Sequence, residues 1–161
     1  MVAVEKFPEH LAIEKKFPEA VHDWHADFGD RTLIVNGQHI AEICKLLRDE
    51  QGYGMLVDLT CVDYYPRRPR FEIVYHLLNL STKGRLRLKA LSDEKTPVVP
   101  TLSKLWPIAN WLEREVWDLY GIKFEGHPNL KRLLLYEEFQ GHPLRKDYPK
   151  TKRQPLVGPQ N

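Results

Sequence analysis

Cysteine is scarce in this chain, with only Cys44 and Cys61 among its 161 residues. Two cysteines are too few for an iron–sulfur cluster, which takes about four protein ligands, and their spacing matches no zinc site. Because no export signal precedes them, a disulfide is disfavoured as well. We therefore expect two buried free thiols, and no cluster held by this chain.

Long apolar runs are also absent. No run approaches the roughly 20 apolar residues that cross a bilayer, and residues 1–6 lack the cationic start and apolar core of a signal peptide. Apolar residues still make up 42% of the chain and aromatic residues 11%, which is enough for the core of one domain. These features predict a soluble, cytoplasmic chain.

The common nucleotide and nucleophile motifs are missing too. No Gly-x-Gly-x-x-Gly follows a strand, no Gly-Lys-Ser/Thr phosphate loop occurs, and there is no Gly-x-Ser-x-Gly elbow. Direct binding of NADH or a flavin through a standard fingerprint is therefore not predicted.

The net charge is only +2, but the positive and negative residues are unevenly distributed along the chain. Residues 123–161 carry eight Lys/Arg against four Asp/Glu, whereas the preceding 122 residues carry 16 against 18. This balance is too mild to require a nucleic acid, and it suits a protein surface. The apolar run from Leu133 to Leu135, with Phe139, also favours a protein-bound arm, because a mobile tail would expose that surface to water.

Patterning in the N-terminal half predicts two helices and a strand. Pro8 suits a first helical residue, and a short helix should run to about Lys16, before Pro18. Residues 32–35 form a β-branched run that stops at an Asn-Gly turn signal. Between Ile40 and Leu47, apolar residues fall at i, i+3, i+4 and i+7, the stripe of an amphipathic helix.

Three alternating segments then predict an antiparallel meander. They cover residues 55–62, 71–80 and 85–90, with Met55 and Val57 expected on the apolar face of the first strand. Helices would cover the apolar face of such a sheet. The predicted fold class is α+β, a small mixed or antiparallel sheet covered by helices, with an extended C-terminal arm.

Prolines and one glycine divide the rest of the chain. Pro97 and Pro100 predict a linker, and Pro107 opens a helix that Gly121 should end in a left-handed conformation. Further prolines disfavour long regular elements beyond it, apart from one short helix or strand at residues 132–138.

We therefore divide the chain into an α+β domain over residues 1–122 and an extended arm over residues 123–161 that docks on a partner subunit.

The charged helix near residue 115 invites an acid–base interpretation that its spacing does not favour. Glu113 and Glu115 are two positions apart, so their side chains point roughly 200° apart and cannot share a proton. Arg114 and Asp118 are four apart and can pair along the helix. A structural role for these charges is favoured over catalysis, and they would hold the helix against the tail or a partner.

Two Gly-His-Pro triplets place His127 and His142 in turns. A metal site there would need two more ligands, and Glu137 and Glu138 are the nearest candidates. Neither histidine has a metal-binding helical spacing, so a hydrogen-bonding role in a turn is favoured.

Several long motifs closely resemble one family. They are Asp58–Tyr64, Arg70–Leu78, Trp111–Ile122, Gly126–Pro128, Arg132–Leu134 and Gly141–Pro149. This pattern is similar to the small C subunit of respiratory complex I, the bacterial NADH:quinone oxidoreductase (NDH-1), whose mitochondrial homologue is the 30-kilodalton subunit. The likeness covers roughly residues 10 to 150 and fades at Thr151–Arg153, where many members have a Thr-Gly-Tyr run.

The resemblance implies a non-catalytic, cofactor-free accessory subunit in the peripheral arm of a proton-translocating enzyme. FMN and iron–sulfur clusters would be bound by other subunits. Its neighbours would be subunits D, B and I, and it would pack chiefly beside the first of these, which we call the quinone-site subunit. It would lie on the cytoplasmic side of the inner membrane, contact the membrane only through the complex and bind no nucleic acid.

The resemblance assigns no catalytic, cofactor-binding or metal-binding residue to this chain. It does mark a family signature that we expect at the partner interface: Glu113, Arg114, Glu115, Asp118, Gly121, His127, Pro128, Arg132, Gly141, His142, Pro143, Arg145, Asp147 and Tyr148.

Besides a nucleic-acid binder, which would use Lys146, Lys150, Lys152 and Arg153 of the tail, two alternatives stay open. One is the homologous subunit of a membrane-bound [NiFe] hydrogenase or another electron-input variant. The other belongs to a different class, a freestanding acid–base or metal enzyme built on Glu113, Glu115 and His127.

Overall fold

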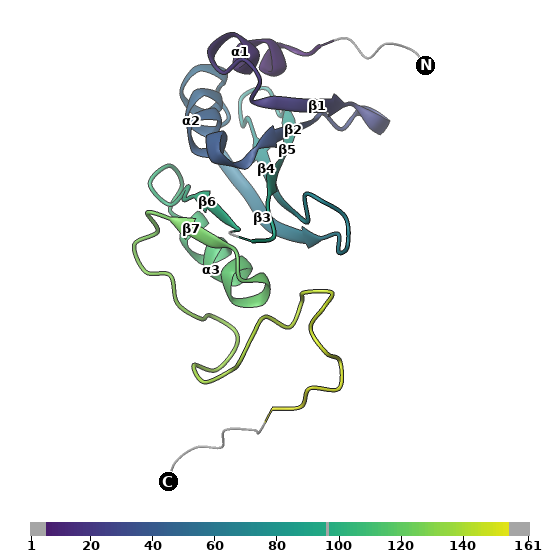
Figure 1. The fold of residues 1–161 in the computed structure, drawn as a ribbon. Helices are drawn as coiled ribbons and strands as arrows, with labels where there is room; N and C mark the ends of the chain where they lie inside the picture. Colours follow the sequence, from purple (N-terminus) through teal and green to yellow (C-terminus); the bar gives the residue numbers. More distant parts are fainter. Residues whose placement is uncertain (1–5, 96, 155–161) are drawn as a thin grey trace.

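A mixed sheet with helices on one side forms the body of the chain, and an irregular arm extends from its lower end (Figure 1). The computed structural model describes residues 6–95 and 97–154. Residues 1–5, part of the segment compared with a signal peptide, and residues 155–161 of the predicted arm lie outside the described residues.

The described regular elements largely follow the sequence patterns. They are α1 (Pro8–Lys16), β1 (Val21–His25), the 3₁₀ turn η1 (Asp27–Gly29), β2 (Thr32–Asn36), the 3₁₀ turn η2 (Gly37–His39), α2 (Ile40–Gln51), β3 (Met55–Asp63), β4 (Phe71–Leu78), β5 (Arg85–Ser92), β6 (Val98–Pro100), α3 (Ala109–Tyr120) and β7 (Lys123–Glu125). The α+β class and the three-stranded meander are confirmed, as are the helix that starts at Pro8 and the left-handed Gly121.

Within the described residues the main sheet has five strands in the order β1-β2-β5-β4-β3. Strand β2 pairs with β5 in parallel, and the other neighbours are antiparallel. This arrangement makes the sheet mixed, because β2 and β5 are linked by a crossover through α2 and the first strands of the meander.

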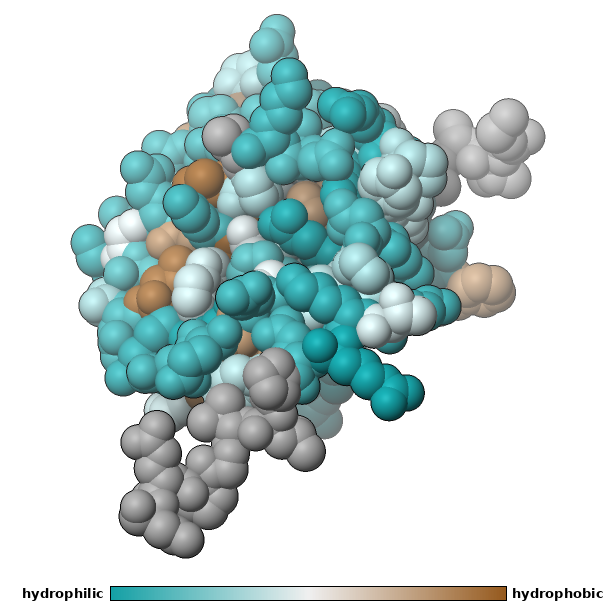
Figure 2. Space-filling model, turned by 60° about the horizontal axis from the view of Figure 1, so that its bottom comes forward, coloured by the Kyte–Doolittle hydropathy of each residue, from teal (hydrophilic) through white to brown (hydrophobic). Residues whose placement is uncertain are grey.

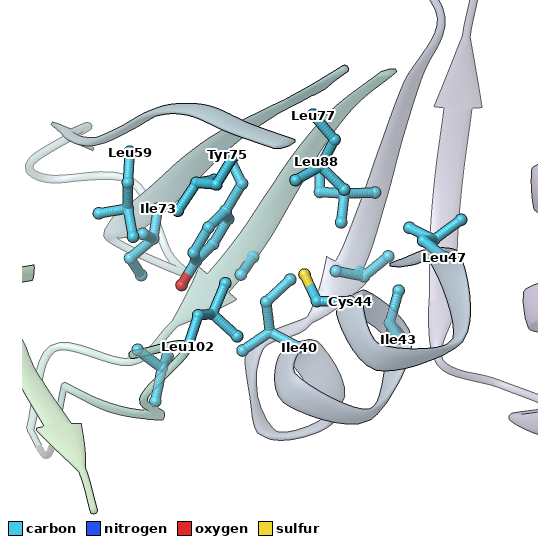
Figure 3. Packing of buried hydrophobic residues seen from close by; sticks show 14 of the residues in the cluster. Ile40, Ile43, Cys44, Leu47, Leu59, Ile73, Tyr75, Leu77, Leu88 and Leu102 are labelled. Atoms are coloured by element: carbon cyan, nitrogen blue, oxygen red, sulfur yellow. The ribbon is translucent and has the colours of Figure 1, made fainter. Parts of the chain in front are cut away.

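The core lies between this sheet and helix α2. Register places Leu33, Leu88, Tyr75 and Leu59 in one row across four strands, and all four are buried. Figure 3 shows sheet residues such as Tyr75 and Leu88 facing Ile40, Ile43, Cys44 and Leu47 of α2. Cys44 and Cys61 are free and buried, as predicted, and burial raises the pKa of both thiols.

The structure corrects the predicted alternation of β3. The register shifts between Leu56 and Asp58, as in a β-bulge. The bulge leaves Met55 and Val57 43% and 40% exposed and buries Leu56 instead. A strict period of two cannot anticipate an inserted residue, so the prediction for Met55 and Val57 was wrong.

Three short strands were not predicted. Strand β1 is too polar to show alternation, and residues 98–100, predicted as a linker, form β6 in parallel with β7. Because β7 spans residues 123–125, the segment without regular structure begins at Gly126. The proposed element at 132–138 is a series of bends and turns.

Candidate docking site

Helix α3 carries the acidic and basic residues around which the C-terminal segment is organised. Glu113, Arg114 and Asp118 are buried, whereas Glu115 lies on the exposed side of the helix. Arg114 and Asp118 do not pair with each other as predicted, because each finds partners in the arm. Arg114 and Asp118 thus hold the helix against the tail, one of the two roles that the sequence predicted for these charges, and the partner interface expected for the signature stays a prediction.

Asp118 is a buried carboxylate that accepts hydrogen bonds from the backbone of the arm. Its Oδ2 accepts the N–H groups of Leu133, Leu134 and Leu135 at 3.0, 2.8 and 2.9 Å. Its Oδ1 accepts a hydrogen bond from the guanidinium of Arg132 at 2.7 Å. Burial alone would raise the pKa of Asp118, but these hydrogen bonds outweigh it and hold the pKa below its usual value.

Two arginines secure the same stretch of backbone. Arg114 donates to the carbonyl oxygens of Lys131 and Arg132, at 3.1 and 3.0 Å. Arg132 in turn donates to the carbonyl oxygens of Phe139 and Gly141. The fork of donors on each guanidinium thus fixes a loop that contains no regular structure.

The C-terminal end of α3 holds the second Gly-His-Pro triplet. Gly121 ends the helix at φ +74°, and a Cβ there would lie 2.5 Å from the ring of His142 and 2.7 Å from Arg145. His142 Nδ1 lies 2.9 Å from the carbonyl oxygen of Asp118, and Arg145 Nε donates to that of Tyr120. These side chains satisfy carbonyl groups that the helix leaves without partners.

Glu113 and the first triplet meet at the other end of the helix. The carboxylate of Glu113 accepts the N–H of Leu102 at 2.6 Å and the hydroxyl of Thr101. His127 Nδ1 accepts the N–H of Asn129, so Nε2 carries the proton and donates to the carbonyl oxygen of Asn110 at 3.1 Å. The same Nε2 lies 3.9 Å from Glu113. Burial outweighs the two hydrogen bonds and raises the pKa of Glu113 to about 7.

An ion cluster that the sequence analysis missed ties the arm to the meander. Arg70 is 1% exposed, and it donates to both oxygens of Asp63 at 2.8 Å. It also donates to Asp147 of the arm at 2.6 and 3.0 Å, and to Glu94 at 2.8 Å. Asp63 further accepts the N–H of Lys146. Burial opposes ionisation of Asp63, but its hydrogen bonds hold its pKa at about 2.

Part of this cluster could have been found in the sequence. Asp63 is the last residue of β3 and Arg70 directly precedes β4, on either side of the proline-containing loop, so the hairpin brings them together. The partner Asp147 depends on the path of the arm, which no periodicity describes.

The distal arm closes on itself. The rings of Phe139 and Tyr148 stack with centroids 6.2 Å apart. Gln154 donates to the hydroxyl of Tyr148 and to the carbonyl oxygen of Gln140, and it accepts the N–H of Gln140. Gly141, at φ +98°, brings the backbone against the Tyr148 ring.

Two prolines complete the signature residues. Pro128 is exposed and Pro143 is half-buried. Across residues 6–95 and 97–154, no group of three or more His, Cys, Asp and Glu side chains is placed to hold a metal ion. His127 and His142 each use a ring nitrogen on a different turn of α3, so the geometry does not join them with Glu137 and Glu138.

Apolar side chains remain on the outside of this assembly. Leu134 is 62% exposed and Leu144 48%, and Ile108 and Trp111 near the start of α3 are exposed as well. Figure 2, in which the lower part of the molecule comes forward, shows small apolar areas within a mainly hydrophilic surface. The arm therefore has a fixed inner side and an outer side that still carries apolar groups.

Comparison with known proteins places the chain in a family. The sequence model of the family described as "Respiratory-chain NADH dehydrogenase, 30 Kd subunit" matches residues 33–154. The chain belongs to this family. Among curated relatives, the NADH-quinone oxidoreductase C subunit from Hyphomonas neptunium is 45% identical over 86% of this chain and 69% of that protein. The corresponding C 2 subunit from Rhizobium meliloti is 46% identical over 88% and 79%.

Solved structures agree with this assignment. The trypsin-resistant fragment of Nqo5 is 33% identical, with a TM-score of 0.63 over 67% of this chain and 89% of the fragment. A chain of the archaeal membrane-bound sulfane sulfur reductase has a TM-score of 0.73 over 86% and 82%, but at 23% identity it shows the fold alone.

Family membership makes this protein one subunit of an enzyme complex, NADH-quinone oxidoreductase or complex I, and so a partner of other subunits of that complex. No helix in the described parts of the chain has the length and apolar character needed to cross a membrane.

Proposed function

We propose that this chain is a non-catalytic, cofactor-free subunit that supports the quinone-site subunit from the cytoplasmic side of the membrane. In this role it carries no electrons itself. FMN and the iron–sulfur clusters belong to other subunits of a proton-translocating enzyme, and subunits B and I are further neighbours.

One observation carries this proposal. The arm follows a fixed path without regular structure, held by Asp118, Arg132 and Arg70, while Leu134 and Leu144 remain exposed on it. Fixing an irregular segment costs conformational entropy, and exposing apolar side chains on it brings no gain in the isolated chain. Both features are accounted for if the pre-ordered arm docks on a neighbour, because pre-ordering lowers the entropy cost of binding.

The signature residues then act indirectly. Most of them hold the arm in its docking conformation, and the exposed leucines and the cationic side chains of the arm contact the quinone-site subunit. The excess of Lys and Arg in residues 123–161 suits an acidic rim around that contact.

The experiment replaces both exposed leucines by serine, in a strain that assembles the whole complex. We expect L134S/L144S to leave the thermal unfolding midpoint of the isolated chain unchanged, because neither side chain is buried. Recovery of the quinone-site subunit with the tagged variant should fall roughly tenfold or more, as for a loss at the centre of an interface.

Leu80 supplies the control, since it is 66% exposed on the β4–β5 turn, away from the arm. L80S should assemble normally. Normal recovery of the quinone-site subunit with L134S/L144S would reject the arm as the docking element.

The main alternative, a subunit of a hydrogenase or another electron-input variant, differs from the proposed complex in its electron donor. Fold similarity to the sulfane sulfur reductase chain does not favour a hydrogenase-like complex, whereas relatives at 45% and 46% identity bear the NADH-quinone oxidoreductase name. NADH-dependent quinone reduction by the purified complex is the expected result, and reduction driven by another donor only would support the alternative.

A further inference from the structure

Phe28 stands fully exposed at the tip of the β1–β2 hairpin. The residue exposes 108% of its reference area, more than any other large apolar residue in the described parts of the chain. A phenylalanine in this position gains no burial from folding. A single exposed apolar residue is common on protein surfaces, but one held in an unfavourable backbone conformation points to a function.

The backbone at Phe28 is also unfavourable for this residue type. Its φ of 56° and ψ of 23° lie in the left-handed region, which glycine and asparagine adopt most readily. Nevertheless the turn is well defined, with hydrogen bonds from Gly29 N–H to Ala26 and from Asp30 N–H to Asp27. The antiparallel register of β1 and β2 runs up to His25 and Thr32, so the tip projects from a paired base.

Two carboxylates flank Phe28 at the tip itself, while Arg31, Arg85 and Arg87 line a pocket with Asp30 at the base of the hairpin. Asp27 and Asp30 flank the Phe-Gly pair, with side chains 72% and 64% exposed, and residues 26–30 contain no Lys or Arg. Asp27 Oδ2 lies 2.9 Å from Nδ1 of His25, and Asp30 Oδ2 lies 3.3 Å from the guanidinium of Arg87. The tip thus presents one aromatic ring between two carboxylates.

We propose that Phe28 anchors a second docking surface, inserting its ring into an apolar pocket with a basic rim on a neighbouring protein subunit. This inference rests on the proposed function, in which the chain is embedded among subunits. Figure 1 places the hairpin tip at the opposite end of the molecule from the arm, so the two surfaces reach different places on the surrounding complex.

A protein pocket fits the tip better than other occupants do. Carboxylates beside the ring would be repelled by an anionic lipid surface. A symmetric contact with a second copy would bring the acidic tips of both chains together. A pocket with a basic rim would bury the ring and pair with the carboxylates in the same contact.

The first test inserts the photo-crosslinking amino acid p-benzoylphenylalanine at position 28 of the tagged chain within the assembled complex. A parallel insertion at position 134 reports on the arm. We expect position 28 to crosslink to a peptide of another subunit that contains apolar residues and Lys or Arg. Crosslinks to lipid only, to a second copy only, or to no subunit would overturn the inference.

The two insertions also separate the proposals. An adduct at 134 without one at 28 removes the second surface and leaves the proposed function standing. Absence of both adducts counts against both proposals.

The second test is Phe28→Asn, with Leu80→Asn as the matched exposed control. Asparagine suits the left-handed backbone, so the unfolding midpoint of the isolated F28N chain should stay equal or rise. Its recovery in the complex should fall roughly tenfold, while L80N assembles normally. A lower unfolding midpoint for F28N would show a structural role and overturn the inference, as would normal recovery.

Discussion

Glu113 is a buried carboxyl group whose two hydrogen-bond donors are neutral. Its pKa of about 7 means that the folded chain holds a proton that the unfolded chain releases near pH 4.5. The stability gained from that proton is fully present below pH 4.5 and is lost as pH rises through about 7. The residue therefore makes the fold less stable on the alkaline side of neutrality.

Glu113→Gln removes this titration while keeping a group of the same shape. We compare the free energy of unfolding of the variant with that of the natural chain. This difference should be more favourable to the variant at pH 8 than at pH 5 by roughly 2 kcal/mol. Urea unfolding at both pH values measures the difference. Glu115→Gln, exposed on the same helix, should change little at either pH, and an equal response of the two variants would contradict the assignment.

At the scale of an element, helix α3 depends on the glycine that ends it. Gly121 combines a left-handed φ with the approach of His142 and Arg145, so any Cβ there meets both side chains. The helix end and the second triplet are therefore one structural unit.

Gly121→Ala should destabilise the chain by about 2 kcal/mol or more, combining the backbone penalty with displacement of His142. Amide hydrogen exchange of residues 142–148 should increase at the same time. Gly54→Ala provides the control, because its added Cβ meets no atom within 4 Å. Unchanged exchange in the Gly121 variant would show that the triplet holds without the helix end.

Element by element, the sequence predicted what periodicity encodes. Helices α2 and α3 and the meander have apolar spacings of 3.6 or 2 residues, and α1 is bounded by prolines, so all of them were found. Strands β1, β6 and β7 are polar or three residues long, so they depend on pairing partners that a local pattern does not contain.

The docking site shows the same limit. Spacing predicted Arg114 as the partner of Asp118, four positions away, whereas the observed partner is Arg132. Side-chain pairs within a helix follow from sequence distance, but pairs with an irregular arm follow from its path. The charged residues of the signature could be picked out, and their partners could not.

At the scale of the molecule, Arg70 joins the sheet, the β5–β6 loop and the arm through Asp63, Glu94 and Asp147. The cluster holds three carboxylates around one buried cation. Removing the cation would leave Asp63 buried without its counter-charge.

Arg70→Met should therefore cost roughly 3–5 kcal/mol in free energy of unfolding, as for other buried ion pairs that lose one partner. Chemical denaturation measures this loss. Arg68→Met, whose side chain is 65% exposed beside the same Glu94, should cost less than about 1 kcal/mol. Similar losses for the two variants would mean that burial does not set the strength of the cluster.

The parallel pairing of β2 with β5 has a consequence for how the chain is made. Thr32 lies opposite Arg87, 55 positions later, so β2 leaves the ribosome long before its partner strand exists. During that interval one edge of the β1–β2 hairpin stays open to other chains. Synthesis that stops before Arg85 leaves the sheet without its central strand, and fragments with such an open strand edge are prone to aggregate.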